Sequence, residues 1–471
     1  MPNSKNLITS NQLPTPKGKW IVGHLPKFNA NNKHQVLEGW VEEVGDLFRL
    51  SFIGKKVIVS ANTALNKEVL RLRPHTFRRF NKMDEIFREM GILGVFNAEG
   101  ETWKNHRKIT SQALNMDNVK GFFPTISKVT DRLLKKWSAI AEHEGEIDVQ
   151  KEMMRYTVDI TTEIAFGYPM NTLEQGENAI QKHMEKIFPM INRRITAPLP
   201  IWRLFKSKRD KEFEVALKAI NDTVRSFIAK GKERIENDAS IKEQPRNFLE
   251  ALLVQQDKED KFTDDEIFGN IFTMLLAGED TTSNSISWTL FFVAQHPEMV
   301  QKIREEAISI IGKNHLPQAF DEIGKLKYAE AAVQESLRLK PVSPNLYMES
   351  IKPVEINGFM FKKNEIIMMQ NKVAQTDSIN FSKPEEFLPE RWINNACPYH
   401  ERAHKPDTIL GFGGGSRFCP GKGLAMTELV MVISTICKKF DLSLAVKPEE
   451  VKEVFAFTMY PENLLVKLKK V

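Results

Sequence analysis

The sequence predicts a mainly α-helical chain with small β-sheets, an α+β fold. Apolar residues recur with the 3.6-residue period of a helix over several long stretches, whereas strand-like alternation is confined to short ones. Of the 471 residues, 41% are apolar and 27% are charged, which excludes a disordered or fibrous chain. No repeat or low-complexity linker interrupts the sequence, so we expect residues 1–471 to form a single domain.

The first β-rich stretch lies near the N-terminus. Apolar residues alternate on both sides of Gly54, which predicts a β-hairpin over residues 48–60. Similar short stretches recur in two later places. We therefore expect the β-rich portions of the chain at about 45–62, 345–375 and 441–471.

Helical periodicity dominates the remaining sequence. We expect helices over residues 124–143, 148–166, 208–235, 263–295 and 326–339. The helix from 263 has the strongest signals, because Thr263 and Glu266 form a capping-box pattern and Pro297 follows its end. Its 33 or so residues would span roughly 50 Å. Since it is apolar almost all round after residue 285, we expect it to cross the middle of the molecule.

Charge and cysteine content restrict the partners and the compartment. A net charge of +6 over 471 residues gives no indication of nucleic-acid binding. Three cysteines, at 397, 419 and 437, form no CxxC pair and favour a reducing compartment. The N-terminus lacks an apolar run long enough for a signal peptide or transmembrane anchor. We expect a cytoplasmic monomer, with an organellar transit peptide as the alternative.

A glycine-rich loop before a helical run is the most informative segment. It has the pattern F-x-x-G-x-R-x-C-x-G, filled by Phe412, Gly415, Arg417, Cys419 and Gly421. Cys419 precedes the helical run directly, where the helix dipole and free backbone N–H groups would lower its pKa and favour the thiolate. The alternative is a buried, inert cysteine behind a glycine-rich loop. Five fixed positions in ten residues favour the functional interpretation.

This loop resembles the cysteine loop of the haem-thiolate monooxygenases, the cytochrome P-450 superfamily. The resemblance implies heme b (iron protoporphyrin IX) bound between the long central helix and the Cys-loop and its helix. It implies that Cys419 is the axial iron ligand, that Arg417 contacts a propionate and that Gly415 and Gly421 let the chain pass close to the porphyrin. Phe412 belongs to the same cofactor-binding loop. Many members have a further propionate-binding Arg after the E-x-x-R helix, which the stretch 344–349 lacks.

A second motif lies in the first quarter of the chain. Trp103 and Arg107 have the i, i+4 spacing of one helix face. The resemblance places both beside the haem propionates, whereas the plainer interpretation is an amphipathic helix with a buried tryptophan. We expect His106, between them, to lie on the surface.

A third motif lies in the long helix, where Ala277, Gly278, Asp280 and Thr281 match the family pattern A-G-x-[DE]-T. The Thr281 hydroxyl can bond back to the carbonyl of Ala277 and bend the helix, and Gly278 leaves space on that face. The resemblance implies a groove for oxygen, with Asp280 and Thr281 delivering protons. A threonine-rich packing kink is the alternative.

A fourth motif is structural. Glu335 and Arg338 form an E-x-x-R pair on one helix, and Arg391 follows in the segment FLPERW. Such pairs are common on protein surfaces. The resemblance nevertheless implies a buried network of these three residues that holds the loop behind the haem.

Together these motifs predict a monooxygenase that uses O2 to hydroxylate or epoxidise a lipophilic substrate such as a fatty acid, terpenoid or steroid. The sequence has no glycine-rich dinucleotide motif, so we expect electrons from a separate NAD(P)H-linked partner, a ferredoxin or a flavodoxin/reductase. Basic residues near the motifs could steer that partner: Lys104, Arg107, Lys108, Lys422, Lys438 and Lys439. The alternatives are a peroxide-driven peroxygenase or isomerase, and a non-catalytic haem-thiolate sensor.

Three apolar segments are expected to line the substrate pocket. They span residues 78–96, 185–205 and 455–458. The second adjoins the basic residues Arg203, Lys206, Lys208 and Arg209 and could instead touch a membrane.

Overall fold

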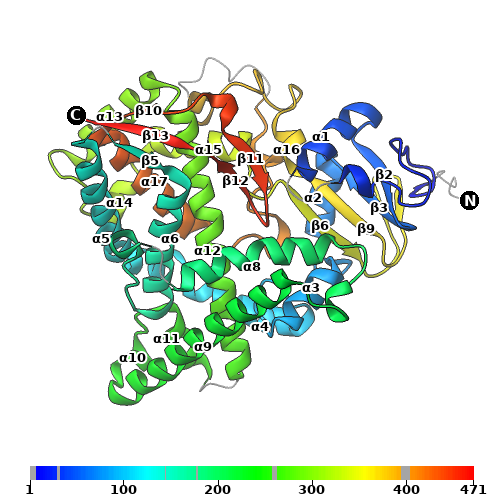
Figure 1. Cartoon of the computed structure of the whole chain (residues 1–471), viewed down its shortest axis with the longest axis horizontal. Helices are drawn as coiled ribbons and strands as arrows, with labels where there is room; N and C mark the ends of the chain where they lie inside the picture. The colour runs from blue at the N-terminus through cyan, green and yellow to red at the C-terminus, as the bar shows by residue number, and fades with distance from the viewer. Residues whose placement is uncertain (1–6, 29–31, 144, 177–178, 257–261, 394–403) are drawn as a thin grey trace, which may run out of the picture.

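The computed structural model describes residues 7–28, 32–143, 145–176, 179–256, 262–393 and 404–471 (Figure 1). Cys397 lies outside the described residues. Helices dominate the architecture and small mixed sheets lie at its edges, which confirms the predicted fold class. The helices are α1 (Lys33–Val44), α2 (Thr63–Arg71), α3 (Asn81–Glu89), α4 (Gly100–Ala113), α5 (Met116–Ala141), α6 (Val149–Phe166), α7 (Thr172–Gln175), α8 (Ala179–Thr196), α9 (Lys208–Asn237), α10 (Ser240–Glu243), α11 (Phe248–Gln256), α12 (Asp264–Val293), α13 (Pro297–Ile311), α14 (Phe320–Ile323), α15 (Lys327–Leu339), α16 (Asn371–Gln375) and α17 (Lys422–Lys439).

The strands fall into four groups. The largest sheet has the order β2-β3-β9-β6-β4, and a neighbouring one has the order β1-β8-β7. A third sheet has the order β10-β13-β5, and β11 and β12 form a separate hairpin. These two groups contain all the strands near the C-terminus. The strands are β1 (Ile8–Thr9), β2 (Leu47–Phe52), β3 (Lys55–Ser60), β4 (Phe77–Arg79), β5 (Glu146–Asp148), β6 (Asn345–Ser350), β7 (Val354–Ile356), β8 (Phe359–Phe361), β9 (Ile366–Gln370), β10 (Phe440–Leu444), β11 (Lys452–Phe455), β12 (Met459–Glu462) and β13 (Leu465–Lys470).

The long helix α12 passes through the middle of the molecule, as the sequence predicts (Figure 1). Its N-terminus is a capping box, because the Thr263 hydroxyl accepts from the backbone N–H of Glu266 and the Glu266 carboxylate accepts from that of Thr263. It packs against α6, α15 and α17. A central, buried helix gives the site a rigid wall.

The helix α5 begins earlier than the sequence predicts. We expected a helix from residue 124, but α5 starts at Met116, and the Asn115 side chain caps it by accepting from the N–H of Asn118 at 2.9 Å. Pro124 lies inside the helix and costs it one backbone hydrogen bond. Tertiary packing of the apolar face outweighs that cost, since Val119, Phe123 and Ile126 are all buried.

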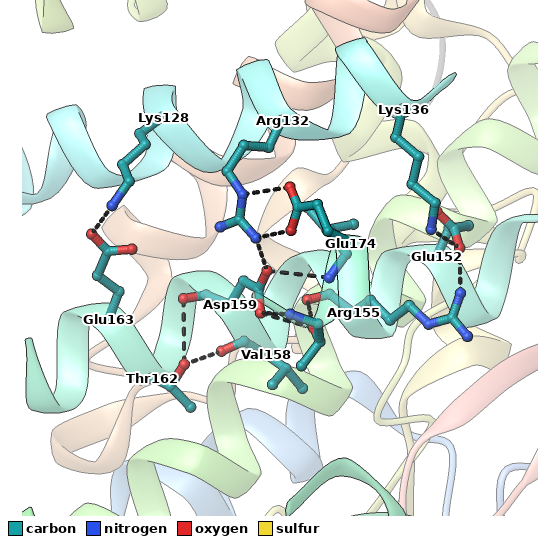
Figure 2. A network of polar contacts seen from close by, with 12 residues as sticks. Lys128, Arg132, Lys136, Glu152, Arg155, Val158, Asp159, Thr162, Glu163 and Glu174 are labelled. Atoms are coloured by element: carbon teal, nitrogen blue, oxygen red, sulfur yellow. Dashed lines mark hydrogen bonds and ion pairs between the residues drawn. The ribbon is translucent and has the colours of Figure 1, made fainter. Parts of the chain in front are cut away.

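Ion pairs and hydrogen bonds link α6 to both α5 and α7 (Figure 2). The buried Asp159 of α6 accepts from Arg132 of α5 at 2.8 Å and from the backbone N–H of Thr172 of α7 at 2.7 Å. Arg132 also binds Glu174. Because α6 packs against α12, this network also stabilises the position of α12, which forms one wall of the site.

Candidate functional site

A cavity lies between the middle of α12 and the loop before α17, and most of the residues selected from the sequence line it. They come from α4, α12 and the cysteine loop: Trp103, Arg107, Ala277, Gly278, Thr281, Phe412, Arg417, Cys419 and Gly421. Gly415 and Asp280 do not line it. All three predicted pocket segments also contribute, through residues such as Phe96, Ile195 and Phe457. Helix, loop and apolar walls therefore meet around one space.

The cysteine loop is shaped by a turn and by one close approach. The backbone N–H of Cys419 donates to the carbonyl of Phe412 at 2.9 Å, and Gly421 is the N-cap residue of α17. Gly415 has a φ of +62°, and a Cβ there would collide with the carbonyl oxygen of Leu70 in α2. The packing of the loop against α2 therefore requires a glycine at position 415.

Burial raises the pKa of the Cys419 thiol above its ordinary value. The backbone N–H groups of Gly421 and Lys422 and the charge of Arg107 act in the opposite direction, but they do not outweigh burial. The expectation of a lowered pKa was therefore wrong in sign, because it counted the helix terminus and left out desolvation. A metal ion bound to the sulfur would displace the proton outright, which suits a thiol in this setting.

The lining of the cavity has a strong excess of positive charge. Among the described residues, five cations line it (Lys33, Arg73, Arg79, Arg107 and Arg417), and Glu428 is the sole acidic residue that does. Arg73 is 4% exposed, yet its Nε and Nη2 atoms have no hydrogen-bond partner in the described part of the chain. The same holds for Nε of Arg417. Burial lowers the pKa of both Arg73 and Arg417 to about 10. Buried, unpaired guanidinium groups are costly, so the cavity is built for an anionic ligand.

Arg417 and Trp103 contact each other as well as the cavity. The Arg417 guanidinium lies 4.3 Å from the centre of the Trp103 ring and donates to the carbonyl of Ala98 at 2.8 Å. Glu99 pairs with the same guanidinium. These contacts fix the direction of Arg417 and leave its Nε without a partner at the cavity.

His106 is 1% exposed, so the expectation of a surface position was wrong. Its Nε2 lies 3.3 Å from Glu266 and its Nδ1 lies 3.2 Å from the amide nitrogen of Asn270, both on α12. Burial lowers its pKa. His106 follows Trp103 by three residues and therefore shares its helix face, a signal that was present in the sequence.

Helix α12 presents a small-residue groove to the cavity. The Thr281 hydroxyl donates to the carbonyl of Ala277 at 2.5 Å, as the spacing predicts. A Cβ on Gly278 would lie 2.9 Å from the Thr161 hydroxyl of α6, so this glycine also allows the close packing of the two helices. Asp280 points away from the groove, where its carboxylate accepts from Thr458 and, at 3.2 Å, from Asn284. Burial raises the pKa of Asp280 to about 6.

The E-x-x-R residues meet in a fully buried network. Arg338 donates to both oxygens of Glu335, at 2.7 and 2.9 Å, and Arg391 donates to the same carboxylate at 2.9 Å. Arg338 also donates to the carbonyls of Gln375, Pro384 and Glu386. The network joins α15 to the segment that leads toward the cysteine loop.

Comparison with known proteins agrees with this geometry. Residues 13–468 match the family model described as Cytochrome P450. The chain belongs to the cytochrome P450 family. Its relatives include the chloroplastic Protein LUTEIN DEFICIENT 5 of Arabidopsis thaliana, 27% identical over 88% of this chain and 70% of the relative. The mitochondrial sterol 26-hydroxylase of Oryctolagus cuniculus is 23% identical over 93% and 83%. The bifunctional cytochrome P450/NADPH–P450 reductase 2 of Bacillus subtilis is 26% identical over 97% of this chain and 42% of its own length.

Members of this family are haem-dependent monooxygenases, and the cavity of this P450 fits a haem. The Cys419 thiol lines the cavity from the loop, and Gly278 lines it from α12. The buried nitrogen atoms of Arg73 and Arg417 that have no protein partner suit the two propionate groups of a haem. In the described residues, no helix is both long and apolar enough to cross a membrane.

Sequence reasoning missed two cations of this P450 that line the cavity, Lys33 and Arg73, and it included Arg79 only as part of the expected pocket segment 78–96. Lys33 lies in α1 and Arg73 in the loop after α2, outside every motif and every predicted pocket segment. The stretch 344–349 contains no arginine, and Arg73 and Arg79 bring positive charge to the cavity from a different part of the chain. No local pattern marks them, because their approach to the cavity is a property of the folded chain.

Proposed function

We propose that this P450 hydroxylates or epoxidises a lipophilic organic substrate of the fatty acid, terpenoid or steroid class, with heme b as its cofactor. The observation that supports this most directly is the composition of the cavity. Cys419 and the groove of α12 share it with a largely apolar wall, which includes Met83, Phe96, Ile195, Phe248 and Phe457. An apolar wall beside the reactive centre selects an apolar substrate and keeps water low.

We assign cofactor binding to side chains that line the cavity. Cys419 is the iron ligand, and Arg73, Arg107 and Arg417 hold the propionates with support from Trp103. The haem, once bound, supplies the activation of O2 for insertion into a C–H or C=C bond. The network of Glu335, Arg338 and Arg391 keeps the cysteine loop in position.

We assign proton delivery to two residues of α12, Asp280 and Thr281. Thr281 places a hydroxyl at the cavity wall, and this hydroxyl can donate to oxygen once it rotates away from the carbonyl of Ala277. The Asp280 carboxyl lies beside that wall, and its partner Thr458 lines the cavity. A carboxyl whose pKa is about 6 exchanges its proton readily near neutral pH. The hydroxyl of Thr458 therefore connects Asp280 with the cavity.

We further propose that electrons arrive from a separate ferredoxin or flavodoxin/reductase. Lys104, Lys108 and Lys422 are exposed around the cysteine-loop side of the molecule, which suits an acidic donor. Arg107 instead faces Cys419 and the cavity and is not part of that surface. A cytoplasmic location stays a prediction, since relatives named chloroplastic and mitochondrial are among the matches.

The decisive experiment combines the haem-loaded protein with NADPH, surrogate donors of both kinds and ¹⁸O2. We expect product from at least one fatty acid, terpenoid or steroid to gain one labelled oxygen atom. Product that forms with hydrogen peroxide alone, and never with donors, would support the peroxygenase alternative. Haem-loaded protein that consumes no NADPH with any substrate would support the sensor.

A further inference from the structure

Lys33 occupies an unfavourable position for a lysine. It is the first residue of α1 and is 1% exposed. Buried lysines are rare unless they are paired, and a cation at a helix N-terminus also opposes the helix dipole. Burial lowers the pKa of Lys33 from 10.5 to about 7. A charged ammonium group at this position therefore lowers the free energy of unfolding.

No acidic residue of the described chain compensates that charge. The ammonium group donates to Oδ1 of Asn192 in α8 and lies 4.5 Å from the centre of the Phe455 ring. Glu453, on the same strand as Phe455, binds His34, Lys340 and Lys372 instead. Burial alone shifts the pKa of Lys33, so no carboxylate lies near enough to affect it.

Lys33 is also separate from the arginines that we assign to the haem propionates. Arg73, Arg107 and Arg417 lie close enough to interact, since the first two help to lower the pKa of Arg417, and none of the three contributes to the lowered pKa of Lys33. The two propionates of a haem, together with Glu99, can balance no more than three of the four arginines that line the cavity. They leave the charge of Lys33 without a counter-ion.

The surroundings of Lys33 form one polar end of the cavity. Lys33, Asn192, Tyr347 and Phe455 line the same space as Thr281. The Tyr347 hydroxyl is buried and makes no hydrogen bond of good geometry among the described residues, although the Asn345 side chain lies close enough to lower its pKa slightly. Burial raises its pKa, so it keeps its proton and can donate. Phe455 is three residues from Thr458, at most about 10 Å of chain, and Thr458 binds Asp280 of α12.

We infer that Lys33, with the Tyr347 hydroxyl and the Asn192 amide, binds the carboxylate of a long-chain carboxylic acid whose apolar chain extends along the cavity toward Thr281. This inference rests on the proposed function and narrows its substrate to fatty-acid-like carboxylates. A single cation among aromatic rings matches a single negative charge at the end of an apolar molecule. A doubly charged phosphate would be left with an uncompensated charge in this apolar setting.

The test compares dodecanoic acid with methyl dodecanoate and dodecan-1-ol, which share the alkyl chain and lack the negative charge. Each is titrated into the haem-loaded full chain at neutral pH, with calorimetry and the haem spectrum as independent readouts. We expect the acid to bind about 10–100-fold more tightly than the ester, as a charge-assisted hydrogen bond predicts. Lys33→Met should remove that preference and leave ester binding within about threefold, and Tyr347→Phe should reduce the preference in part.

Lys363→Met is the matched control, because Lys363 is exposed in the β8–β9 loop, outside the cavity. It removes the same net charge and should keep the preference for the acid. Lys33→Met should fold, since it removes a buried charge and keeps the length of the side chain. Equal binding of acid and ester in the wild type, or a preference that survives Lys33→Met, would overturn the inference.

These results can be separated from the proposed function. Oxidation of the ester and alcohol without any preference for the acid would overturn the role of Lys33 and support the monooxygenase function. Binding of dodecanoate through Lys33, with no substrate oxidised by any donor, would support the carboxylate site and contradict the proposed function.

Discussion

Thr458 donates a hydrogen bond to Oδ2 of Asp280 and so ties the turn between β11 and β12 to the middle of α12. Asn284, one helical turn further along, donates to the other carboxylate oxygen at 3.2 Å. These two contacts direct the Asp280 carboxylate toward Thr458 and Asn284, and Asp280 itself does not line the cavity. Asp280 and Thr281 therefore have different environments although they are adjacent in the sequence. The Asp280 carboxyl is buried, and the Thr281 hydroxyl lies on the cavity wall.

The buried state of Asp280 predicts a pH-dependent gain in stability for Asp280→Asn. Raising the carboxyl pKa from 3.8 to about 6 costs the folded state about 3 kcal/mol above pH 6. The folded state binds more protons than the unfolded state between these pH values, so stability falls as the pH rises through this window. We expect Asp280→Asn to exceed the wild type in free energy of unfolding at pH 7–8 by up to that amount, and to lose the advantage toward pH 4.

The measurement is denaturant unfolding at several pH values. Asp321→Asn, on the exposed face of α14, is the control and should show no such trend. An advantage that is constant with pH would mean that the variant gains through packing and not through the removed carboxyl. The same variant should turn over more slowly, because the carboxyl that takes up and releases protons beside Thr458 is lost.

Arg73→Leu should weaken haem binding. Two nitrogen atoms of this buried guanidinium have no partner in the described residues, and leucine removes the charge that a propionate would neutralise. A charge-assisted hydrogen bond contributes about 1.5–3 kcal/mol, so we expect haem to be lost to apomyoglobin roughly 10–100 times faster. Arg71→Leu, two residues away and paired on the surface with Glu68, should keep the wild-type rate. Equal rates for both variants would exclude Arg73 as a propionate ligand.

Glu335→Ala should give little haem-loaded protein. The substitution leaves Arg338 and Arg391 buried without their shared carboxylate, and breaking such a cluster costs about 3–5 kcal/mol. Glu330→Ala is the control on the same helix, because Glu330 forms an exposed i, i+3 pair with Lys327. Expression and the haem-to-protein ratio report the outcome. Full haem content in Glu335→Ala would show that the network does not support the cysteine loop.

Cys419→Ala should abolish the absorption band that thiolate ligation gives to the reduced, carbon-monoxide-bound protein. Cys437→Ala is a matched substitution within α17, where the cysteine is fully buried and does not line the cavity. It should keep the band. Retention of the band in Cys419→Ala would transfer the ligand role to another cysteine.

The parts of the fold and site that sequence predicts are those that local patterns determine. Helix α12 follows from its capping box and its apolar period, and the bond between Thr281 and Ala277 follows from i, i+4 spacing. The cavity cations Lys33 and Arg73 could not be predicted in this way. The neighbours of Lys33 come from elements as distant as α8 and β11, so its burial is decided by tertiary packing alone.

Two errors have physical causes of a different kind. His106 was assigned to the surface although its spacing from Trp103 places it on the buried face, where α12 supplies its partners. The pKa of Cys419 was expected to fall because the helix terminus is visible in the sequence, whereas the desolvation that raises it is not. Burial is thus the quantity that sequence patterns estimate least well at this site.

Thr281→Ala tests the hydroxyl at the cavity wall. The variant should keep haem binding and substrate affinity, since these depend on Cys419, the arginines and the apolar wall. Without the hydroxyl, oxygen is reduced but is not directed to the substrate, so NADPH is still consumed while hydrogen peroxide replaces product. General acid assistance is typically worth about 10²–10⁴-fold, and we expect product per NADPH to fall by at least about tenfold.

Thr289→Ala is the matched control for that loss. Thr289 lies on the same helix and makes the same back-bond, from its hydroxyl to the carbonyl of Ser285 at 2.8 Å, but it does not line the cavity. Its removal changes the helix in the same way without changing the wall, so coupling should remain at the wild-type level. If both variants lose coupling equally, the effect belongs to the bend of α12 and the motif at 277–282 is a packing kink. If only Thr281→Ala does so, the hydroxyl itself serves oxygen chemistry.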